Sequence, residues 1–516
     1  MNYSGHGAAY TLSHEQVAHL EDFNINASQR LPLWLTASCD IMPFDGQEEN
    51  IGETAMLNPQ GGAVAFYGTT RTVYAHYNGY MNRAYTRYVL GSDDDGRRYT
   101  IGEAARLAKN LLMTPTSQGR STSGRFDTSK NDIGMDQTAN KLQFTLLGDP
   151  ALTLAAPTMQ IVVDSISGQP ADAKTPVTLS AGQPVSIVGH VVGAPDFKGM
   201  VTLTVKDVEQ EITCRQNASD GTDPFVYKDR PVTLYTGSDS VRSGRFTVRF
   251  ALPKDISTTD GTGLMTLYAL SADKHSEAHG YCTNFTMSAD TAAVTDGIGP
   301  NIYCYLNSES FVNGGSVNPT PLFRAELYDK DGINVSGSGI GHDLELIVDG
   351  QMSMTYVLND YFQYDFGDYC SGSLNFTLPE LSVGQHKLLL RAWDVKNNSS
   401  TAELQFEVVK SLQPSVYSVG CTKNPAKTST TFYVSHDRAG SQVDVQIDVF
   451  DTSGRQLWRH RGSGVSAGQT YTVDWDLTTT GGHRLQTGVY LYRVMVSSDG
   501  SSEASQAKKL IILRNN

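Results

Sequence analysis

LPLWLTASCD (residues 31–40) is the stretch that decides the fold of the first part of the chain. The residues before Cys39 form an almost continuous apolar run, which is typical of a β-strand buried on both faces. GGAVAFYG (61–68) has the same character. Helical patterns occur at IGETAMLN (51–58) and at IGEAARLAKNLLM (101–113), where apolar residues recur once per helical turn. Strands that alternate with helices predict a parallel α/β sheet.

Beyond about residue 155 helical periodicity almost vanishes, and short strand-like segments recur between Gly, Asp, Asn, Pro and Ser. This pattern indicates β-sandwiches. DGIGPNI (296–302) and KSLQPS (410–415) mark expected domain boundaries within this region. VDVQIDVF (443–450) alternates apolar and polar residues, as a strand with one buried face does. We therefore expect part of an α/β domain followed by three all-β sandwich domains. The expected boundaries are 1–155, 156–295, 296–410 and 411–516.

The composition narrows the class of protein. The 516 residues carry a net charge of -14, and no Lys/Arg-rich run could neutralise phosphates, so we expect no nucleic-acid partner. No apolar run reaches the roughly 18 residues that a transmembrane helix needs. The N-terminus has no signal peptide and begins inside a motif. We interpret Met1 as the edge of a fragment whose targeting segment lies upstream.

Six cysteines are scattered along the chain, and none forms a C-x-x-C pair that would indicate a zinc ribbon or a redox motif. Cys214 could pair with Cys282, and Cys304 could pair with Cys370. The spacing leaves these pairings open. Cys39 has no evident partner, which makes it the cysteine of interest.

YSGHGAAY (3–10) places His6 between two glycines that let the backbone pass close to another group. If MNYS ends a strand, His6 and Cys39 lie at adjacent strand ends, where sites in open α/β sheets gather. An imidazole beside a thiol can lower the thiol pKa from about 8.5 to roughly 3.5–7.5 and can then protonate a leaving amine. The non-catalytic alternatives are that Cys39 is a small buried apolar residue and that His6 merely lies in a turn.

An oxyanion in such a site would receive the N–H groups of Gly7 and Cys39. The residues that follow the two strands are candidates to line a substrate cleft, although a polar loop or a capped turn would have the same composition. These residues are Asp40, Thr69, Thr70, Arg71 and Tyr74. We expect no metal site, because DDD (93–95) lacks the spacing of a calcium loop. We also expect no cofactor.

Five motifs, in order, resemble the gingipain family of cysteine peptidases: YSGHG (3–7), LTASCD (35–40), GE (52–53), GGAVAFYGTTRTVY (61–74) and LLGDPAL (146–152). The resemblance implies a caspase-like α/β fold. It places the catalytic dyad on His6 and Cys39 and an oxyanion-hole N–H on Gly7. It implies a structural role for the GDP element at Gly148. It also implies that the first half of the catalytic domain is missing, so that this chain starts within it.

The segments VDVQIDVFDTSGRQLW (443–458), GVYLYRVMV (488–496) and KKLII (508–512) resemble the immunoglobulin-like sorting domain of the type IX secretion system of Bacteroidetes. The order of the chain, with a gingipain-like part, then β-modules, then a sorting-type domain, resembles the sortases of that system. The fold implied is the C-terminal part of a caspase-like domain followed by three immunoglobulin-like sandwiches.

The activity implied is that of a cysteine endopeptidase and transpeptidase. It removes C-terminal sorting domains from exported cargo and links the cargo to anionic lipopolysaccharide. An acyl group on Cys39 suits this reaction, because an amine can replace water in resolving a thioester. The implied location is the outer face of the outer membrane. The implied partners are the cargo, the lipopolysaccharide acceptor, a β-barrel shuttle protein and a surface protein of the attachment complex.

Two other functions fit the same sequence. One is a secreted gingipain-like protease that degrades extracellular protein and loses residues 411–516 on maturation, whereas a sortase should retain them. The other is a multi-sandwich surface adhesin with an inactive peptidase remnant. Intact His6 and Cys39 argue against the adhesin.

Overall fold

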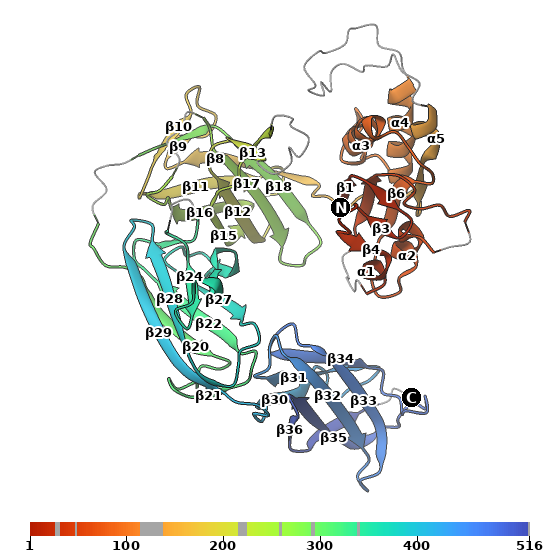
Figure 1. Cartoon of the computed structure of the whole chain (residues 1–516), viewed down its shortest axis with the longest axis vertical. Helices are drawn as coiled ribbons and strands as arrows, with labels where there is room; N and C mark the ends of the chain where they lie inside the picture. Colours follow the sequence, from red (N-terminus) through yellow and green to blue (C-terminus); the bar gives the residue numbers. More distant parts are fainter. Residues whose placement is uncertain are drawn as a thin grey trace. The chain divides into compact units, whose positions relative to one another are not determined.

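The computed structural model divides the chain into two compact units, Met1–Ala156 and Pro157–Asn516. The described helices α1–α5 all lie in the first unit, and the second unit is built from strands and two short 3₁₀ helices (Figure 1). None of the described helices is long and apolar enough to cross a membrane. The structure describes residues 1–25, 31–46, 49–113, 138–214, 224–256, 261–289, 295–337 and 341–513.

The main sheet of the first unit has the order β1-β5-β6-β7. β1 is parallel to β5, and β5 is parallel to β6, as predicted. β7 runs antiparallel to β6, so the predicted all-parallel sheet is wrong at this edge. The four strands are β1 (Asn2–Ser4), β5 (Leu33–Ala37), β6 (Ala65–Thr69) and β7 (Phe144–Leu147).

Helices cover both faces of this sheet, which explains the continuous apolar runs of β5 and β6. One face packs against α3 and α4 through a cluster that includes Leu35, Tyr85 and Ala104. The other face packs against α1 and α2 through Phe23, Ile51 and Phe66. The remaining elements are β2 (Gly7–Ala8), β3 (Thr11–Leu12), β4 (Ala18–His19), α1 (Leu20–Ile25), α2 (Ile51–Leu57), α3 (Ala75–Val89), α4 (Ile101–Met113) and α5 (Thr138–Gln143).

Both predicted helices are present, as α2 and α4, and the GDP element is structural as the sequence indicated. The backbone N–H groups of Ile101 and Gly102, which open α4, donate to the carbonyl groups of Leu152 (2.7 Å) and Pro150 (3.0 Å). These bonds satisfy donors that a helix start leaves open. Gly148 has φ 127° and lies so close to β6 that a Cβ would stand 2.9 Å from the Cβ of Ala65. The turn therefore ties α4 to the sheet.

The strands between residues 159 and 288 surround one apolar core. Seven of them follow the order β11-β16-β15-β12-β17-β18-β8, and β8 also pairs with β11, so the ladder closes on itself instead of forming two separate sheets. The strands are β8 (Met159–Ile166), β9 (Gln169–Pro170), β10 (Val177–Ser180), β11 (Pro184–Val191), β12 (Gly199–Lys206), β13 (Gln210–Cys214), β14 (Phe225–Asp229), β15 (Thr233–Arg242), β16 (Arg245–Ala251), β17 (Leu264–Ser271), β18 (Glu277–Cys282) and β19 (Phe285–Ser288).

The next module pairs a four-stranded sheet, β20-β22-β27-β26, with a sheet that follows the order β21-β29-β28-β24-β25 and takes in β23. Its buried cluster runs from Leu306 to Val408. Its elements are β20 (Asn301–Leu306), β21 (Ser316–Val317), β22 (Leu322–Tyr328), β23 (Ile333–Asn334), β24 (Glu345–Val348), η1 (Met352–Met354), β25 (Thr355–Val357), η2 (Asn359–Tyr361), β26 (Phe362–Tyr364), β27 (Ser371–Thr377), β28 (Gly384–Asp394) and β29 (Ser399–Val408).

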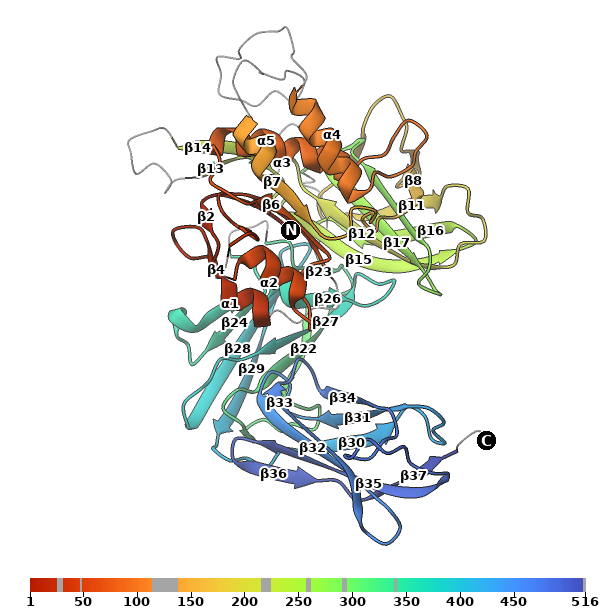
Figure 2. The ribbon, with the colours of Figure 1, turned by 90° about the vertical axis from the view of Figure 1, so that its right-hand side faces the viewer.

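The last module also has two sheets, β30-β31-β34 and β33-β32-β35-β36 with β37 beside β35 (Figure 2, blue). Val443, Val445 and Ile447 are buried in β32 as predicted, but the alternation fails at Asp448, which is also buried and accepts a hydrogen bond from Arg459 (2.6 Å). The expected boundaries at 156, 296 and 411 stay predictions. The strands are β30 (Val416–Cys421), β31 (Thr430–His436), β32 (Gln442–Phe450), β33 (Gln456–Val465), β34 (Thr470–Trp475), β35 (Gly488–Ser498), β36 (Ser501–Ala504) and β37 (Lys508–Ile512).

Candidate active site

The parallel pairing of β1 and β5 brings the two sequence motifs to one edge of the sheet. Ser4 is opposite Ala37, and the N–H of Gly5 donates to the carbonyl of Ala37 (3.3 Å) just beyond the end of β1. His6 and Cys39 each follow two residues after the last residue of their strand. The carboxyl ends of parallel strands meet at the same edge, so the loops that carry these residues begin side by side.

Gly7 packs directly against the loop that carries Cys39. A Cβ at this position would stand 2.8 Å from Cδ1 of Ile41 and 2.9 Å from both Cβ and Oγ of Ser38, so a larger residue would push the two loops apart. Gly7 pairs with Leu12 in the β2–β3 hairpin, and the flanking N–H of Ser13 donates to the carbonyl of His6 (2.8 Å). Gly7 is therefore at a non-hydrogen-bonded position, where its N–H points away from β3.

His6 has a fixed backbone and an exposed side chain. Its carbonyl accepts the hydroxyl of Tyr3 (2.6 Å) as well as the N–H of Ser13. Gly5 allows the tyrosine to fold back in this way, since a Cβ there would stand 2.6 Å from the Tyr3 hydroxyl oxygen. The imidazole thus projects from an anchored loop toward solvent, where a substrate can reach it.

Cys39 is half-buried, and its thiol donates to the carbonyl of Val73 (3.4 Å) in the loop after β6. Asp40 follows with φ 47°, an uncommon conformation for a residue other than glycine, and its N–H donates to the carbonyl of Arg71 (3.4 Å). Within the described part of the chain, the N–H of Cys39 itself makes no hydrogen bond. A carbonyl oxygen of a substrate could therefore accept it.

Of the five predicted cleft residues, Asp40 lies in the Cys39 loop, and Arg71 and Thr69 contact that loop. The hydroxyl of Thr72 donates to the Asp40 carboxylate (2.7 Å), which favours the capped-turn interpretation of Asp40. Arg71 makes a double hydrogen bond to Asp45, and the guanidinium holds the pKa of the Asp45 carboxyl below its usual value. Asp45 and Thr72 could not be identified from the sequence, because nothing in their spacing marks them.

Thr70 and Tyr74 lie in the same loop but are turned differently. The hydroxyl of Thr70 donates to the side-chain oxygen of Gln143 (2.8 Å), next to β7. Tyr74 is 63% exposed and precedes α3, where its N–H and carbonyl are both held by the side chain of Asn140 (3.0 Å each). Tyr74 is thus free to meet a ligand, whereas Thr70 is engaged with the protein.

Thr69 does not line a cleft, so this part of the prediction is wrong. Its side chain is completely buried, and its hydroxyl donates to the carbonyl of Ser38 (2.5 Å). A polar residue at a strand end predicts a cleft position, but the side chain of Thr69 points into the protein, against the Cys39 loop.

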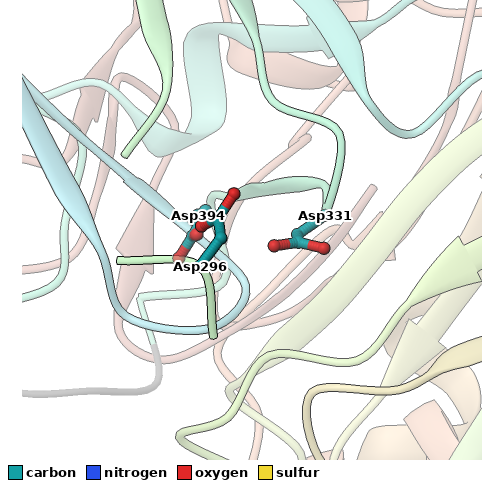
Figure 3. Close-up of side chains that lie close together, drawn as sticks. All are labelled: Asp296, Asp331 and Asp394. Atoms are coloured by element: carbon teal, nitrogen blue, oxygen red, sulfur yellow. The ribbon is translucent and has the colours of Figure 1, made fainter. Parts of the chain in front are cut away.

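The second unit contains a carboxylate cluster that the sequence pattern did not single out. Figure 3 shows Asp296, Asp331 and Asp394 close together. One carboxylate oxygen of each lies within 4.8 Å of the others, a spacing that could hold a metal ion. Each carboxylate already has protein partners: Lys330 binds Asp296 (2.8 Å), Lys396 binds Asp331 (2.9 Å), and the side chain of Asn398 donates to Asp394 (2.6 Å). These contacts describe a structural junction of loops.

All six cysteines are free thiols, so neither of the two disulfides that the spacing allowed is formed. Burial raises the pKa of the thiols of Cys304 and Cys370 to about 11. Both thiols are therefore protonated and poorly nucleophilic near neutral pH.

The geometry of the first unit agrees with a comparison against known families. The pattern that defines peptidase family C25 matches residues 1–155. Residues 1–155 belong to peptidase family C25. This part of the chain is a gingipain-family cysteine peptidase segment, as the ordered motifs indicated. No curated protein sequence matches the chain.

Two solved structures show what the chain is similar to. The dimeric latent PorU from Porphyromonas gingivalis is 31% identical, with a TM-score of 0.37, and the match covers 88% of this chain and 41% of that one. The Arg-specific cysteine proteinase gingipain R is 18% identical, with a TM-score of 0.24, and the match covers 56% of this chain and 52% of that one. The chain thus spans about two fifths of PorU and about half of gingipain R.

Proposed function

We propose that Cys39 is the nucleophile and His6 the general base of a cysteine peptidase that transfers acyl groups as a sortase. The main support for the dyad is the close packing of Gly7 against Ser38. These two residues are the sequence neighbours of His6 and Cys39, so their packing brings the two loops together. Membership of residues 1–155 in peptidase family C25 supports the same assignment.

The dyad would form a thioester. His6 takes the proton of the Cys39 thiol, and the sulfur attacks the carbonyl carbon of the substrate peptide bond. The carbonyl oxygen becomes an oxyanion that accepts the N–H groups of Cys39 and Gly7. The imidazolium of His6 then gives its proton to the leaving amine, the C–N bond breaks, and an acyl group stays on Cys39.

A nucleophile then releases the acyl group and completes the reaction. An amine attacks the thioester carbon, its proton passes to His6, and the Cys39 thiol is restored as an amide forms. Water would give a carboxylic acid by the same route. We propose amine transfer as the physiological outcome, with the new carboxyl end of exported cargo joined to anionic lipopolysaccharide. The resemblance of residues 443–512 to a type IX sorting domain supports this choice.

The same resemblance supports a place for the protein at the outer face of the outer membrane. The substrates would be exported proteins with C-terminal sorting domains. The proposed partners are a β-barrel shuttle protein and a surface protein of an attachment complex, in addition to the lipopolysaccharide acceptor.

A trapping experiment tests the dyad. The full chain is incubated with a peptide that spans the junction between a cargo protein and its sorting domain, and the acyl-enzyme is sought by mass spectrometry on the peptide that contains Cys39. We expect the adduct in the unmodified chain and no adduct in Cys39→Ala. Acylation elsewhere in both chains would refute the assignment of Cys39.

A partition experiment tests transfer against hydrolysis. Increasing glycinamide is added to the same reaction, and the ratio of amide to acid product is measured. A sortase should favour the amine at millimolar concentrations, where water is in large excess. Acid as the sole product would instead support the secreted protease.

A further inference from the structure

Thr69 makes two hydrogen bonds that hold the Cys39 loop in place. Its side-chain hydroxyl donates to the carbonyl of Ser38 (2.5 Å), and its own carbonyl accepts the N–H of Met42 (3.0 Å). The residue is fully buried at the end of β6, so solvent does not compete for either bond. The loop from Ser38 to Met42 is thus held at both of its ends by one residue.

The bond to Ser38 bears on the proposed oxyanion site because of peptide geometry. The carbonyl of Ser38 and the N–H of Cys39 belong to one planar peptide group, and in a trans peptide they point in opposite directions. Fixing the carbonyl toward Thr69 therefore fixes the N–H of Cys39 on the side opposite Thr69. A hydrogen bond to the carbonyl also polarises the amide and strengthens its N–H as a donor.

A neighbouring residue shows that a buried threonine hydroxyl in this sheet need not donate to a carbonyl of the Cys39 loop. Thr36 in β5 is as completely buried as Thr69, but its hydroxyl has no hydrogen-bond partner among the described residues. The two threonines have the same chemistry and the same burial on adjacent strands, and only one of them touches the peptide group before the nucleophile.

We propose that Thr69 is a positioning residue that orients the Ser38–Cys39 peptide group so that the N–H of Cys39 faces the oxyanion. This rests on the proposed function, in which that N–H stabilises the tetrahedral intermediate. Thr69 touches neither the substrate nor the reacting sulfur. Its effect should therefore fall on steps that form an oxyanion and should spare the nucleophilicity of the thiol.

The test compares two reactions of the full chain. Release of p-nitrophenolate from p-nitrophenyl acetate measures acylation, which passes through an oxyanion. Alkylation by iodoacetamide, followed by mass spectrometry of the peptide with Cys39, measures the thiol in a displacement that forms no oxyanion. Cys39→Ala supplies the background of the ester reaction, and thermal unfolding checks that each variant is folded.

Thr69→Val keeps the shape of the side chain and removes the hydroxyl. We expect acylation to fall about 10- to 100-fold, because loss of a whole oxyanion donor costs roughly 10²–10³ and this change only misaligns one. Alkylation should stay within about twofold. Thr69→Ser, which restores the hydroxyl, should recover acylation to within about threefold, and the matched control Thr36→Val should leave both reactions near their original rates.

Three results would overturn the inference: unchanged acylation in Thr69→Val, an equal loss of acylation and alkylation in that variant, or the same loss in Thr36→Val. If Thr69→Val does not fold, Thr69→Ala removes the same hydroxyl and is judged by the same criteria. Failure of the proposed function has a different signature, since the unmodified chain would then acylate no faster than Cys39→Ala, and it would refute the role of Thr69 as well.

Discussion

The loops around Cys39 and the loops around Asp394 are both junctions of strand ends, and they treat their polar groups in opposite ways. Around Cys39, the N–H groups of Gly7 and Cys39 take no part in the backbone hydrogen bonds that connect the described residues of these loops, and the thiol is half-buried. In the second, Asp394 is fully buried and accepts the N–H groups of Lys396 (2.9 Å) and Asn398 (2.7 Å).

The difference separates a candidate site from a structural junction. Buried polar groups are normally paired, because leaving one unpaired costs free energy. N–H groups left open beside an accessible thiol are therefore stronger evidence of function than a carboxylate cluster in which each residue has a protein partner, even though one oxygen of Asp331 is unpaired. The experiments that follow challenge this distinction, beginning with the change expected to have the largest effect.

Loss of Cys39 should have the largest effect. Cys39→Ala should lower peptide cleavage by a factor of about 10³ or more, since the proposed acyl-enzyme forms on this thiol. Cys304→Ala and Cys370→Ala should leave cleavage within about twofold, because burial raises the pKa of both thiols to about 11. Initial rates of cleavage by the full chain measure all three. Residual activity in Cys39→Ala above a few per cent would remove this cysteine from the mechanism.

Gly7→Ala should come next. The new Cβ would stand 2.9 Å from Cβ of Ser38, so the loops must separate and the Gly7 N–H must shift from the proposed oxyanion position. We expect kcat to fall about 100-fold, as when one oxyanion donor is lost, with a smaller change in KM. Steady-state kinetics measure this.

Gly468→Ala is the matched control, because a Cβ there meets nothing within 4 Å. It should change neither kcat nor KM appreciably. If Gly7→Ala had near-normal kcat, the contact between the two loops would be irrelevant to catalysis.

The sequence predicted those features of the site that depend on strand pattern, and it failed where direction matters. The apolar runs of β5 and β6 identified buried parallel strands, and parallel pairing then placed His6 and Cys39 at one edge. The orientation of Thr69 could not be predicted, because a polar residue at a strand end can point into the protein or out of it. Only the position of Ser38 reveals its role.

Helix α3 was missed for a different reason. Its sequence, AHYNGYMNRAYTRYV, contains few aliphatic residues, and the core is built instead from Tyr85, Met81 and Val89. Tyrosine occurs in cores and at surfaces alike, so its spacing gives a weak periodic signal. The antiparallel direction of β7 could not be predicted. Helices α3, α4 and α5 lie between β6 and β7 in the chain, and strands connected through helices are usually parallel.

Asp329 connects the carboxylate cluster to pH. Burial, together with the charges of the neighbouring carboxylates, raises the pKa of the Asp329 carboxyl from 3.8 to about 6. Between these values the folded state holds a proton that the unfolded state has lost, so stability falls as pH rises from about 4 to 6. Above pH 6 the full cost is present, about 2–3 kcal/mol by linkage.

Asp329→Asn should reduce this dependence and stabilise the module at pH 7.5, and the part that remains should come from Asp394, whose carboxyl pKa burial also raises. Hydrogen exchange of β22 and β23 in the full chain, at pH 5 and pH 7.5, measures the local free energy of opening after correction for intrinsic exchange. Asp360→Asn, at an exposed position of the same module, serves as the control. Equal pH dependence in Asp329→Asn and the unmodified chain would show that Asp329 is not the group responsible.

The ion pair of Arg71 with Asp45 should contribute least to stability, although it lies beside the candidate site. The two side chains are 48% and 58% exposed, and exposed pairs of this kind gain little because water screens them. Asp45→Asn should move the unfolding temperature by less than about 2 °C, as should Glu403→Gln in the equally exposed pair of Lys387 with Glu403. Thermal unfolding of both variants at low and high salt measures this. A drop of several degrees in Asp45→Asn alone would mean that the pair holds the Cys39 loop in place, and the loop would then owe its geometry to a surface charge as well as to the buried bonds of Thr69.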